Sequence, residues 1–555
     1  MSQSWFKPHP VGIYPRGNAK NPDELAAKRF GSLSPLQLAT RGARSPRGCV
    51  AGCTPTEEAF VELTLHLLSF CPVDDLCRLS STCTAWYCFI HASDAYKQAH
   101  GLISPQYTCF HSSWKVTAIR AFLDSRNCTD TTPTKRRRLE FGSSRGVLSC
   151  NPIAVSRPFY SDHLFQAWMC TILPCHYHLV HVTGDAPFSG EESGGLAVSR
   201  LNGAGSGVLR LRSTLNEVPR CSHLTPEEFR ARFEMKNLPV ILTDVATEWP
   251  IFKILNGKFE NLSRKRSAFF REGVCAGTPM RCEHTTMSVV DYVRYALQQK
   301  DERPIYMFDS EFGIHMSAES LYAVPTHFGR DDFFKVLGTQ RPRYRWIVAG
   351  PRRGGSSFHI DPNYTSAWNA NLTGRKRWIL LPPGCTPPGV FPSEDMSEVA
   401  TPVSLTEWLL NHYDSTVEQW RGIGYECICE PGDIIFVPCG WWHFVINLED
   451  SVAITQNYVS ECNLPNVIKF LSAMTSSISG IGEDGDDSNS GQMTEKRRAR
   501  FAEEFCAAMR ASYPDLMRRV ESDLEREARE RQKRKKTCSP LPLLASDSGG
   551  FTFDF

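Results

Sequence analysis

The chain has no cysteine pair spaced as Cys-x-x-Cys, no run of about 18 apolar residues and no large excess of charge of either sign. Its 21 cysteines are scattered over 555 residues, which argues against a disulfide or zinc-ribbon framework and predicts reduced thiols. The first residues, MSQSWFKPHPVGIYPRG, lack the apolar core of a secretory signal. A formal net charge of +2 gives no bulk attraction to nucleic acid or membrane, so direct nucleic-acid binding stays open at local basic runs. We therefore expect a protein that is neither secreted nor membrane-bound.

The length and a hydrophobic content of 41% allow two to four domains with substantial cores. Composition and periodicity predict a disordered segment at 1–53, a small helical module at 54–100, a basic linker at 126–156, one ordered domain at 211–470, an acidic Gly/Ser loop at 479–491, helices at 494–530 and a basic tail at 531–555.

The small helical module begins with a predicted capping box, in which Thr54 is the N-cap, Pro55 takes the first helical position and Glu57 follows three residues after the cap. Apolar side chains then recur at helical spacing: Leu63, Leu67 and Phe70, and after Pro72 also Leu76, Leu79, Cys83, Trp86 and Ile90. A second capping box is expected at Thr225, Pro226 and Glu228, inside the ordered domain. Two or three short helices of this kind are too small to form a large core alone.

The stretch SSFHIDPNYTSAWNANLTGRKRWILLPPG (356–384) predicts three strands, at 357–361, 365–372 and 375–381. Because side chains alternate along a strand, His359 and Asp361 are expected on the same face. The segment 425–459 has four further short strands separated by turn residues, and His443 lies in the third of them.

Two histidines and one carboxylate that converge on a metal form the facial triad of non-haem Fe(II) oxygenases. An isolated His-x-Asp is common by chance, and zinc in a purely structural site would accept similar ligands without redox chemistry. The surrounding residues favour iron. Lys376 lies within an apolar strand, and a buried ammonium is costly without an anion. A dicarboxylate co-substrate would supply that anion, with Thr455 as a hydroxyl donor.

The segments FHIDP…TSAWNANLTGRKRWILLPP and PGDIIFVPCGWWHFVINLEDSVAITQN resemble the JmjC family of Fe(II)- and 2-oxoglutarate-dependent oxygenases. The likeness spans about residues 211–470 and is greatest to the subgroup of nuclear lysyl hydroxylases and arginine demethylases. It implies a mainly β core folded as a double-stranded β-helix (the cupin or JmjC jelly roll) with flanking helices. It also implies Fe(II), 2-oxoglutarate and O₂ as cofactors and co-substrates.

The resemblance assigns roles to single residues. His359, Asp361 and His443 match the iron ligands and catalytic triad. Lys376, Thr455, Asn369, Tyr306, Ser356 and Asn457 match positions around the co-substrate. The implied activity is hydroxylation of lysyl side chains, or demethylation of methylated arginine or lysine. The implied substrates are nuclear basic proteins such as histones or splicing factors.

The helical module at 54–100 resembles an F-box, which docks on Skp1 in cullin-based ubiquitin ligases. An alternative function follows: the chain recruits substrates to a ligase and uses its cupin domain only for recognition. The intact triad, with Lys376 and Thr455, argues against that alternative, because an adaptor does not need these residues.

Two basic runs, at 135–138 and 531–536, indicate a nuclear location, with a cytoplasmic one still open. The helices at 494–530 resemble those through which relatives dimerise, so a homodimer is expected. His176, His178 and His181 have a spacing that is sometimes seen in metal sites, but we expect them on a half-buried strand.

Overall fold

The protein is represented by a computed structural model. It describes residues 9, 11–14, 63–129, 159–172, 179–182, 208–211, 214–264, 266–269, 279–283, 285–316, 318–329, 332–393, 396, 398–481 and 490–537. The chain divides into two compact units, of which the first comprises Met1–Arg330 and Arg343–Tyr458, and the second comprises Asp331–Pro342 and Val459–Phe555.

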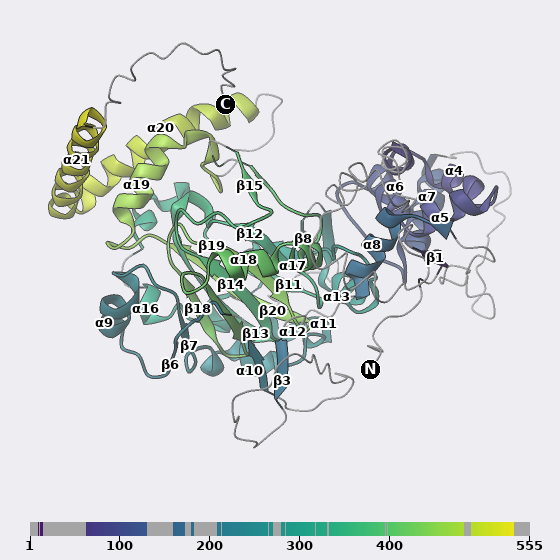
Figure 1. The fold of residues 1–555 in the computed structure, drawn as a ribbon, viewed down its shortest axis with the longest axis horizontal. Coiled ribbons are helices and arrows are strands. Elements are labelled where there is room, and N and C mark those ends of the chain that lie inside the picture. The colour runs from purple at the N-terminus through teal and green to yellow at the C-terminus, as the bar shows by residue number, and fades with distance from the viewer. Residues whose placement is uncertain are drawn as a thin grey trace, which may run out of the picture. The chain divides into compact units, whose positions relative to one another are not determined.

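The first unit is built on a nine-stranded sheet, which is mostly antiparallel (Figure 1). Its strands, in spatial order, are β6 (Arg220–Cys221), β7 (Val240–Leu242), β18 (Ile434–Val437), β13 (Ser366–Thr373), β20 (Ser451–Tyr458), β11 (Arg345–Gly350), β10 (Met307–Asp309), β8 (Pro279–Cys282) and β9 (Thr285–Ser288). The central strand β20 pairs along most of its length with both β11 and β13.

A smaller, five-stranded sheet faces the first one. It contains β12 (Gly355–His359), β19 (Trp442–Asn447), β14 (Lys376–Leu381), β17 (Tyr425–Cys429) and β5 (Asn216–Glu217), in this order. From β11 to β14, and again from β17 to β20, successive strands alternate between the two sheets. This path is the double-stranded β-helix, and the expected mainly β jelly-roll core is therefore confirmed.

The core between the sheets follows from the alternation of side chains along each strand. Trp378 and Leu380 of β14 join residues of the large sheet in one apolar cluster. Their neighbours Ile379 and Leu381 point the other way, into a cluster with α17 (Leu405–Asn411) and α18 (Tyr413–Gln419). The same alternation sends Lys376 toward the interior of the jelly roll.

Arg377, next in sequence, therefore lies on the outer face of β14, under α18. Its side chain is fully buried, and its Nε donates to Glu426 Oε1 at 2.6 Å. The hydroxyl of Tyr413 donates to the other oxygen of Glu426 at 2.9 Å. A charged pair with 0% exposure on both side chains stands here in place of apolar packing.

Short helices pack against the large sheet, on the face turned away from the interior of the jelly roll. They are α9 (Pro226–Phe229), α10 (Pro250–Leu255), α11 (Asn261–Arg264), α12 (Arg266–Phe269), α13 (Val289–Gln298), α14 (Phe312–His315), α15 (Ala318–Leu321) and α16 (Thr326–Gly329). The capping box predicted before α9 is confirmed, because Thr225 Oγ1 accepts the N–H of Glu228, and Glu228 Oε2 accepts the N–H of Thr225. α13 contributes Tyr292 and Tyr295, both fully buried, to the largest apolar cluster.

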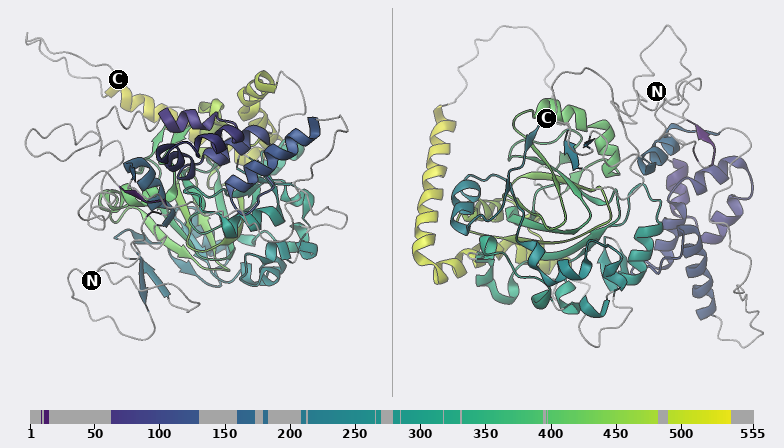
Figure 2. Two further views of the ribbon diagram at one scale, coloured as in Figure 1. Left: turned by 90° about the vertical axis from the view of Figure 1, so that its right-hand side faces the viewer. Right: turned by 90° about the horizontal axis from the view of Figure 1, so that it is seen from below.

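The predicted helical module is also part of the first unit (Figure 2). A helix at 63–69 is followed by α4 (Val73–Leu79), α5 (Thr84–His91), α6 (Ala95–Ile103), α7 (Trp114–Thr129) and α8 (Asp162–Ile172). Leu76 and Ile90, predicted on one apolar face, are fully buried in its core, whereas Cys83 is exposed. The module is larger than expected, because α6 to α8 contribute to the same core.

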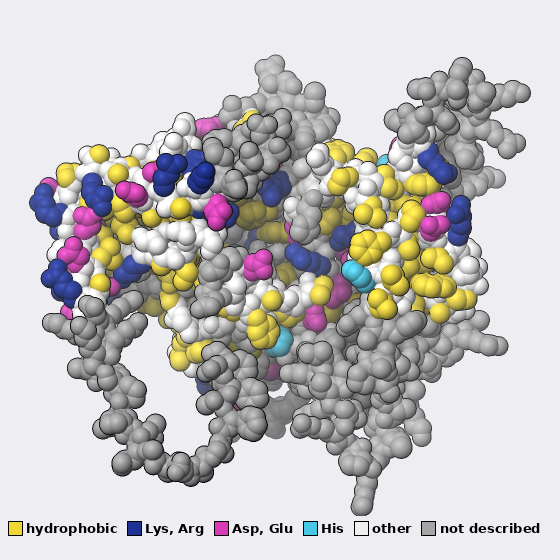
Figure 3. Space-filling view, turned by 90° about the horizontal axis from the view of Figure 1, so that it is seen from above, with side chains coloured by type: hydrophobic (Ala, Val, Ile, Leu, Met, Phe, Trp, Pro, Cys, Tyr) yellow, Lys and Arg dark blue, Asp and Glu magenta, His cyan; other side chains and the backbone are white. Residues whose placement is uncertain are grey.

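Two details of the module add to the sequence analysis. Residues 1–53 were expected to be disordered; of these the structure describes residues 9 and 11–14, where β1 (Ile13–Tyr14) pairs with β2 (Phe159–Tyr160), and Val11 and Ile13 are buried in the core of the module. The apolar stripe predicted at 63–70 lies on the surface, since Leu63, Leu67 and Phe70 are 54%, 55% and 64% exposed. Hydrophobic side chains accordingly gather on the surface of the module in Figure 3.

The second unit contains the predicted C-terminal helices as α19 (Leu464–Ala473), α20 (Ser490–Ser512) and α21 (Pro514–Thr537). Phe501, Phe505 and Met509 recur at helical spacing along α20 and are buried in the core of this unit, together with Val520 of α21. α21 extends through the basic run at 531–537, which was expected to belong to a tail. Acidic and basic side chains alternate on the surface of these helices in Figure 3.

Several expectations concern residues outside those described. They are the capping box at 54–57, most of the linker at 126–156 beyond the end of α7, the loop at 482–489, the tail at 538–555, and His176 and His178. His181 lies on β3 (Leu179–Val182), which pairs with β4 (Val208–Leu211), as expected for a strand residue. In the part of the chain that the structure describes, no helix is long and apolar enough to cross a membrane.

The buried pair on β14 predicts a strong dependence of stability on one interaction. Replacing Glu426 with Gln would leave the Arg377 charge buried without its counter-charge, a change that typically costs about 3–5 kcal/mol. We expect a loss of this size in the free energy of unfolding, measured by urea denaturation. The exposed Lys253, paired with Glu248 at 3.0 Å, serves as the control, and Lys253→Ala is expected to cost less than about 1 kcal/mol. Equal losses in the two variants would contradict the assignment.

Candidate active site

Three potential metal ligands converge at one end of the small sheet. His359 is the last residue of β12, and His443 lies on the neighbouring strand β19, directly opposite in register. Their ring centroids are 4.1 Å apart, and His443 Nε2 lies 3.9 Å from Asp361 Oδ2. One ligand atom from each residue lies within 4.8 Å of the other two. Of the described residues, this is the one group with three such ligand atoms.

Asp361 reaches this cluster by a route that strand periodicity does not describe. β12 ends at His359, with an irregular register before it, and Asp361 precedes the 3₁₀ turn Pro362–Tyr364. The predicted strand at 357–361 has the right length, but it is displaced by two residues toward the C-terminus of the observed strand. The carboxylate is directed to the histidines by this turn and not by the alternation of side chains along a strand.

The close approach of β12 to β19 requires glycine at position 355. Gly355 has a φ of +145°, and a Cβ atom there would lie 2.1 Å from the carbonyl oxygen of Val445 on β19. A larger residue would force the two strands apart, because backbone atoms cannot move aside as a flexible side chain can. This glycine therefore preserves the pairing that places His359 opposite His443.

Backbone carbonyls hold both imidazoles in one orientation. His359 Nδ1 lies 2.8 Å from the oxygen of Ser357, and His443 Nδ1 lies 3.1 Å from that of Trp441. With Nδ1–H donating to a carbonyl, Nε2 keeps its lone pair for a metal. Burial lowers the pKa of both histidines to about 4, helped at His359 by His443, so both rings are neutral at physiological pH.

The third ligand has one oxygen satisfied and one left over. Asn457 Nδ2 donates to Asp361 Oδ1 at 3.1 Å and to Thr365 Oγ1 at 2.8 Å. Asp361 Oδ2 is buried and has no hydrogen-bond partner among the described residues. Burial raises the pKa of Asp361 to about 6, and it outweighs the opposing effects of His359 and of the hydrogen bond from Asn457. Two neutral imidazoles and this oxygen fit a divalent cation with open coordination positions.

A second feature of the site is a buried ammonium. Lys376 lies on β14, separated from β12 by β19, and its side chain is 0% exposed. Its Nζ donates to the hydroxyl of Tyr306 at 3.1 Å, and it forms no ion pair with a described carboxylate. Burial lowers the pKa of Lys376 to about 7. An anionic ligand beside Nζ would favour the charged form of Lys376.

The large sheet contributes polar side chains to the same interior. Thr455 of β20 and Asn369 of β13 are directly opposite each other in register. Thr455 Oγ1 donates to the backbone oxygen of Trp368 at 2.9 Å, and Asn369 Oδ1 is buried without a partner in the described parts of the chain. Ser356 lies on β12, opposite Val445 of β19. The residues expected around a co-substrate thus come from both sheets.

The structure therefore brings together the three expected metal ligands and, separately, Lys376 with Tyr306, and it pairs Thr455 with Asn369. It ties Asn457 to the triad carboxylate. Sequence reasoning missed the two carbonyls that orient the imidazoles. No sequence signal could have found them, because every residue carries a carbonyl group and only the fold decides which one lies near a ring nitrogen.

Comparison with known proteins agrees with this geometry. Residues 226–463 match the family described as cupin-like domain. The arginine-specific demethylase JMJ22 of Arabidopsis thaliana is 37% identical over 379 residues, which cover 68% of this chain and 64% of that protein. The bifunctional arginine demethylase and lysyl-hydroxylase psr-1 of Caenorhabditis elegans is 37% identical over 251 residues, or 44% of this chain and 61% of psr-1.

A third relative is the 2-oxoglutarate and iron-dependent oxygenase JMJD4 of Mus musculus, 34% identical over 180 residues, which cover 31% of this chain and 39% of that protein. The chain spans less than two thirds of the length of each of these relatives. The matched region contains all nine residues predicted for the site, from Tyr306 to Asn457. Residues 226–463 of this chain belong to the cupin-like family and form a domain of the JmjC type.

Proposed function

We propose that the protein is an Fe(II)- and 2-oxoglutarate-dependent protein oxygenase. The observation that carries the proposal is the convergence of His359, Asp361 and His443, together with the lack of a hydrogen-bond partner for Asp361 Oδ2 among the described residues. The names of JMJ22, psr-1 and JMJD4 support it, because all three denote oxygenases or demethylases. A structural zinc site is disfavoured, because such sites have four protein ligands and are closed.

The anion site around Lys376 supports 2-oxoglutarate as the co-substrate. We assign the distal carboxylate of 2-oxoglutarate to Lys376 and Tyr306, with Thr455 as a further hydroxyl donor. Asn369 supplies an unsatisfied amide oxygen and rotatable N–H donors, and Ser356 adds a hydroxyl on the strand that carries His359. Asn457 acts through Asp361, which it holds in place.

When bound, iron couples the loss of CO₂ from 2-oxoglutarate to the insertion of one oxygen atom of O₂ into a substrate C–H bond, giving succinate and an alcohol. The protein supplies neutral imidazoles with fixed orientation, a carboxylate held by Asn457, and an ammonium that becomes charged when the anion arrives. These groups are arranged before any ligand binds, so little reorganisation is needed.

We propose lysyl or methylated arginyl and lysyl side chains of basic nuclear proteins, such as histones or RNA-processing factors, as substrates. Hydroxylation of lysine gives a stable alcohol, whereas hydroxylation of an N-methyl group releases formaldehyde. The same site residues serve both outcomes, and the position of the C–H bond decides between them. The names of JMJ22 and psr-1 include both activities.

The function as a ligase adaptor is not supported, because the relatives named above are enzymes. We keep three features as proposals: contact of the helical module with Skp1 through the exposed Leu63, Leu67 and Phe70, dimerisation through α20 and α21, and a nuclear location. A normal Skp1 pull-down with Leu67→Glu would contradict the first.

The triad predicts metal-dependent modification. The His359→Ala variant is expected to lose Fe(II) binding, measured anaerobically by equilibrium dialysis, and to lose succinate formation. Mass spectrometry of basic peptides should show either the gain of one oxygen atom on lysine or the loss of a methyl group with release of formaldehyde. This change should occur with the native protein and not with His359→Ala. The exposed His223 gives the matched control, and His223→Ala should retain both activities. Fe(II) binding retained by His359→Ala would contradict the assignment.

The buried lysine predicts a specific effect on co-substrate affinity. The Lys376→Met variant keeps most of the side-chain volume but removes a charge-assisted contact worth about 2–3 kcal/mol, so 2-oxoglutarate should bind roughly 30–150-fold more weakly. Calorimetric titration measures this change, and Fe(II) affinity should not change. The exposed Lys253→Met variant is the control. Unaltered 2-oxoglutarate affinity in Lys376→Met would place the co-substrate elsewhere.

The lowered pKa of Lys376 predicts how this affinity depends on pH. The dianion binds the charged lysine, whose pKa in the free protein is about 7, with the neutral hydroxyl of Tyr306 and the thiol of Cys429 as its titratable neighbours. Affinity should be constant below that pH and should fall by about tenfold per pH unit above it, because binding then requires uptake of a proton. In Lys376→Met this dependence should vanish, and a profile shared by both proteins would refute the explanation.

A further inference from the structure

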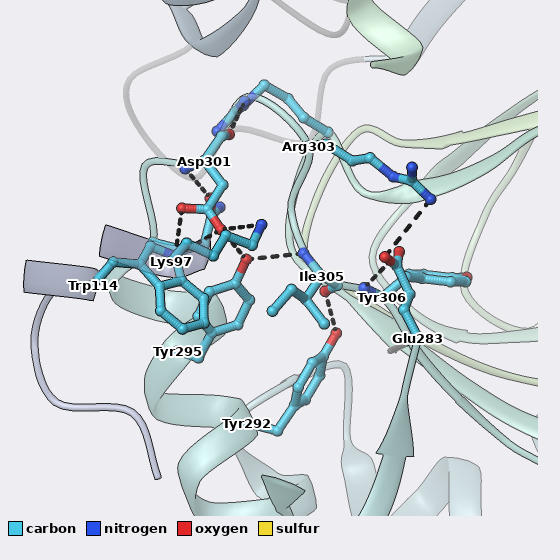
Figure 4. Close-up of polar contacts among 11 residues, drawn as sticks. Lys97, Trp114, Glu283, Tyr292, Tyr295, Asp301, Arg303, Ile305 and Tyr306 are labelled. Carbon is cyan, nitrogen blue, oxygen red and sulfur yellow. Dashed lines mark hydrogen bonds and ion pairs between the residues drawn. The ribbon is translucent and has the colours of Figure 1, made fainter. Parts of the chain in front are cut away.

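A second buried ionic cluster lies outside the triad, around Asp301 (Figure 4). The side chain of Asp301 is 6% exposed, and Lys97 Nζ lies 3.1 Å from its Oδ2. Trp114 Nε1 donates to the two carboxylate oxygens at 2.9 and 3.0 Å, and the hydroxyl of Tyr295 donates to Oδ2 at 2.7 Å. The function proposed above does not use this cluster.

The cluster is connected to Tyr306 through hydrogen bonds to the backbone. The hydroxyl of Tyr295 accepts the N–H of Ile305 at 2.8 Å, and that of Tyr292 accepts the N–H of Met307 at 3.1 Å. Glu283 Oε1 accepts the N–H of Tyr306 itself at 3.2 Å. Three consecutive amides around Tyr306 are therefore held by side chains, and Figure 4 shows these side chains directed at the 305–306 segment.

Tyr306 in turn connects to the co-substrate lysine. Its hydroxyl accepts the hydrogen bond from Lys376 Nζ at 3.1 Å, and its side chain is 6% exposed. Burial raises the pKa of Tyr295 well above its ordinary value, so its hydroxyl stays protonated and donates to Asp301. A continuous chain of contacts therefore runs from Asp301, through Tyr295 and the backbone of Ile305, to Tyr306 and Lys376.

Two of the side chains that donate to Asp301 belong to the helical module, Lys97 on α6 and Trp114 at the start of α7. The Trp114 indole packs against both the cupin core and the core of the module, and its ring contacts Phe110 and Tyr295. Tyr107 forms a parallel β-bridge with Thr286 on the edge strand β9. The module is therefore attached to the cupin domain beside the segment that carries Tyr306.

Lys97 of the module supplies the positive charge that balances the buried Asp301 carboxylate. Burial disfavours the charge of Lys97, but Asp301 and Asp94 outweigh this effect and raise its pKa, so the ammonium stays charged. Without Lys97, Asp301 would be a buried carboxylate without its cation. Such a group is costly and would move toward water, and Tyr295 would lose its acceptor.

We propose that the Lys97–Asp301 pair is a positioning device, through which the helical module holds Tyr306, and thereby Lys376, in the geometry that binds the co-substrate anion. The module thus acts as a part of the co-substrate pocket and not only as a surface for partners. This inference rests on the proposed function, because it concerns the affinity for 2-oxoglutarate.

The test compares Lys97→Met with Lys115→Met in the full chain. Lys115 lies on α7 of the same module, with its Nζ 5.9 Å from the ring centroid of Tyr96, outside the cluster. We expect Lys97→Met to weaken 2-oxoglutarate binding by about tenfold and to raise its KM, with kcat at saturating co-substrate and Fe(II) affinity unchanged. Lys115→Met should match the native protein, and Lys97→Arg, which keeps the charge, should restore affinity.

A double-mutant cycle identifies the route of the effect. If the contribution of Lys97 passes through Lys376, the Lys97→Met change should have little further effect on affinity in a Lys376→Met background. Hydrogen–deuterium exchange gives a readout that needs no ligand: amides at 305–307 should exchange faster in Lys97→Met than in Lys115→Met.

The possible outcomes are distinct. Unchanged exchange and unchanged affinity in Lys97→Met would overturn the inference, as would an equal loss of Fe(II) and 2-oxoglutarate binding, which indicates general destabilisation. Failure of the native protein to bind 2-oxoglutarate would instead refute the proposed function, and with it the role of this cluster in co-substrate binding. Faster exchange at 305–307 would then show only that the cluster orders that segment.

Discussion

The burial of one ammonium group is the constraint on which the rest of the site depends. Lys376 has no exposed surface and no ion pair in the described structure, and the hydroxyl of Tyr306 is the side-chain partner it has. Such a group is unfavourable in a folded protein unless a ligand supplies the missing charge. The position of Tyr306 therefore matters, and the structure secures it with three amide hydrogen bonds and a second buried ionic cluster. In the function proposed above, the distal carboxylate of 2-oxoglutarate supplies that charge.

The metal ligands follow the same principle. Both imidazoles are neutral with one nitrogen fixed by a carbonyl, and Asp361 has one oxygen satisfied by Asn457 and one without a partner among the described residues. In these three residues, the described structure thus provides a partner for each imidazole Nδ1 and for Asp361 Oδ1. The remaining atoms converge from two adjacent strands and a turn, and β19 lies between the strand of His359 and the strand of Lys376. One small sheet therefore positions both histidines of the triad and the lysine that we propose binds the co-substrate anion.

The helical module combines an exposed apolar stripe with buried contacts to the cupin domain. Its sequence resembles a docking module, and its apolar stripe at Leu63, Leu67 and Phe70 is indeed exposed. The module also supplies Lys97 and Trp114 to a buried carboxylate of the cupin domain. A surface available to a partner and a contact that reaches the co-substrate pocket therefore belong to one small helical core. This arrangement would allow a partner to influence catalysis if it altered the packing of α6 or α7.

The residue pattern by itself predicted the strands around the site and the C-terminal helices, because side-chain alternation, helical periodicity and turn residues are local properties. The jelly-roll class and the roles of the site residues came from the resemblance to a known family. Tertiary structure alone decided that Asp361 reaches the metal position from a turn, that Arg377 is buried against Glu426 while Lys376 faces the interior, and that Asp301 meets Lys97 from a segment 204 residues away. The physical reason is that the hydrogen bonds and ion pairs of buried groups depend on which distant segments pack together. Local patterns in a single sequence do not predict that packing.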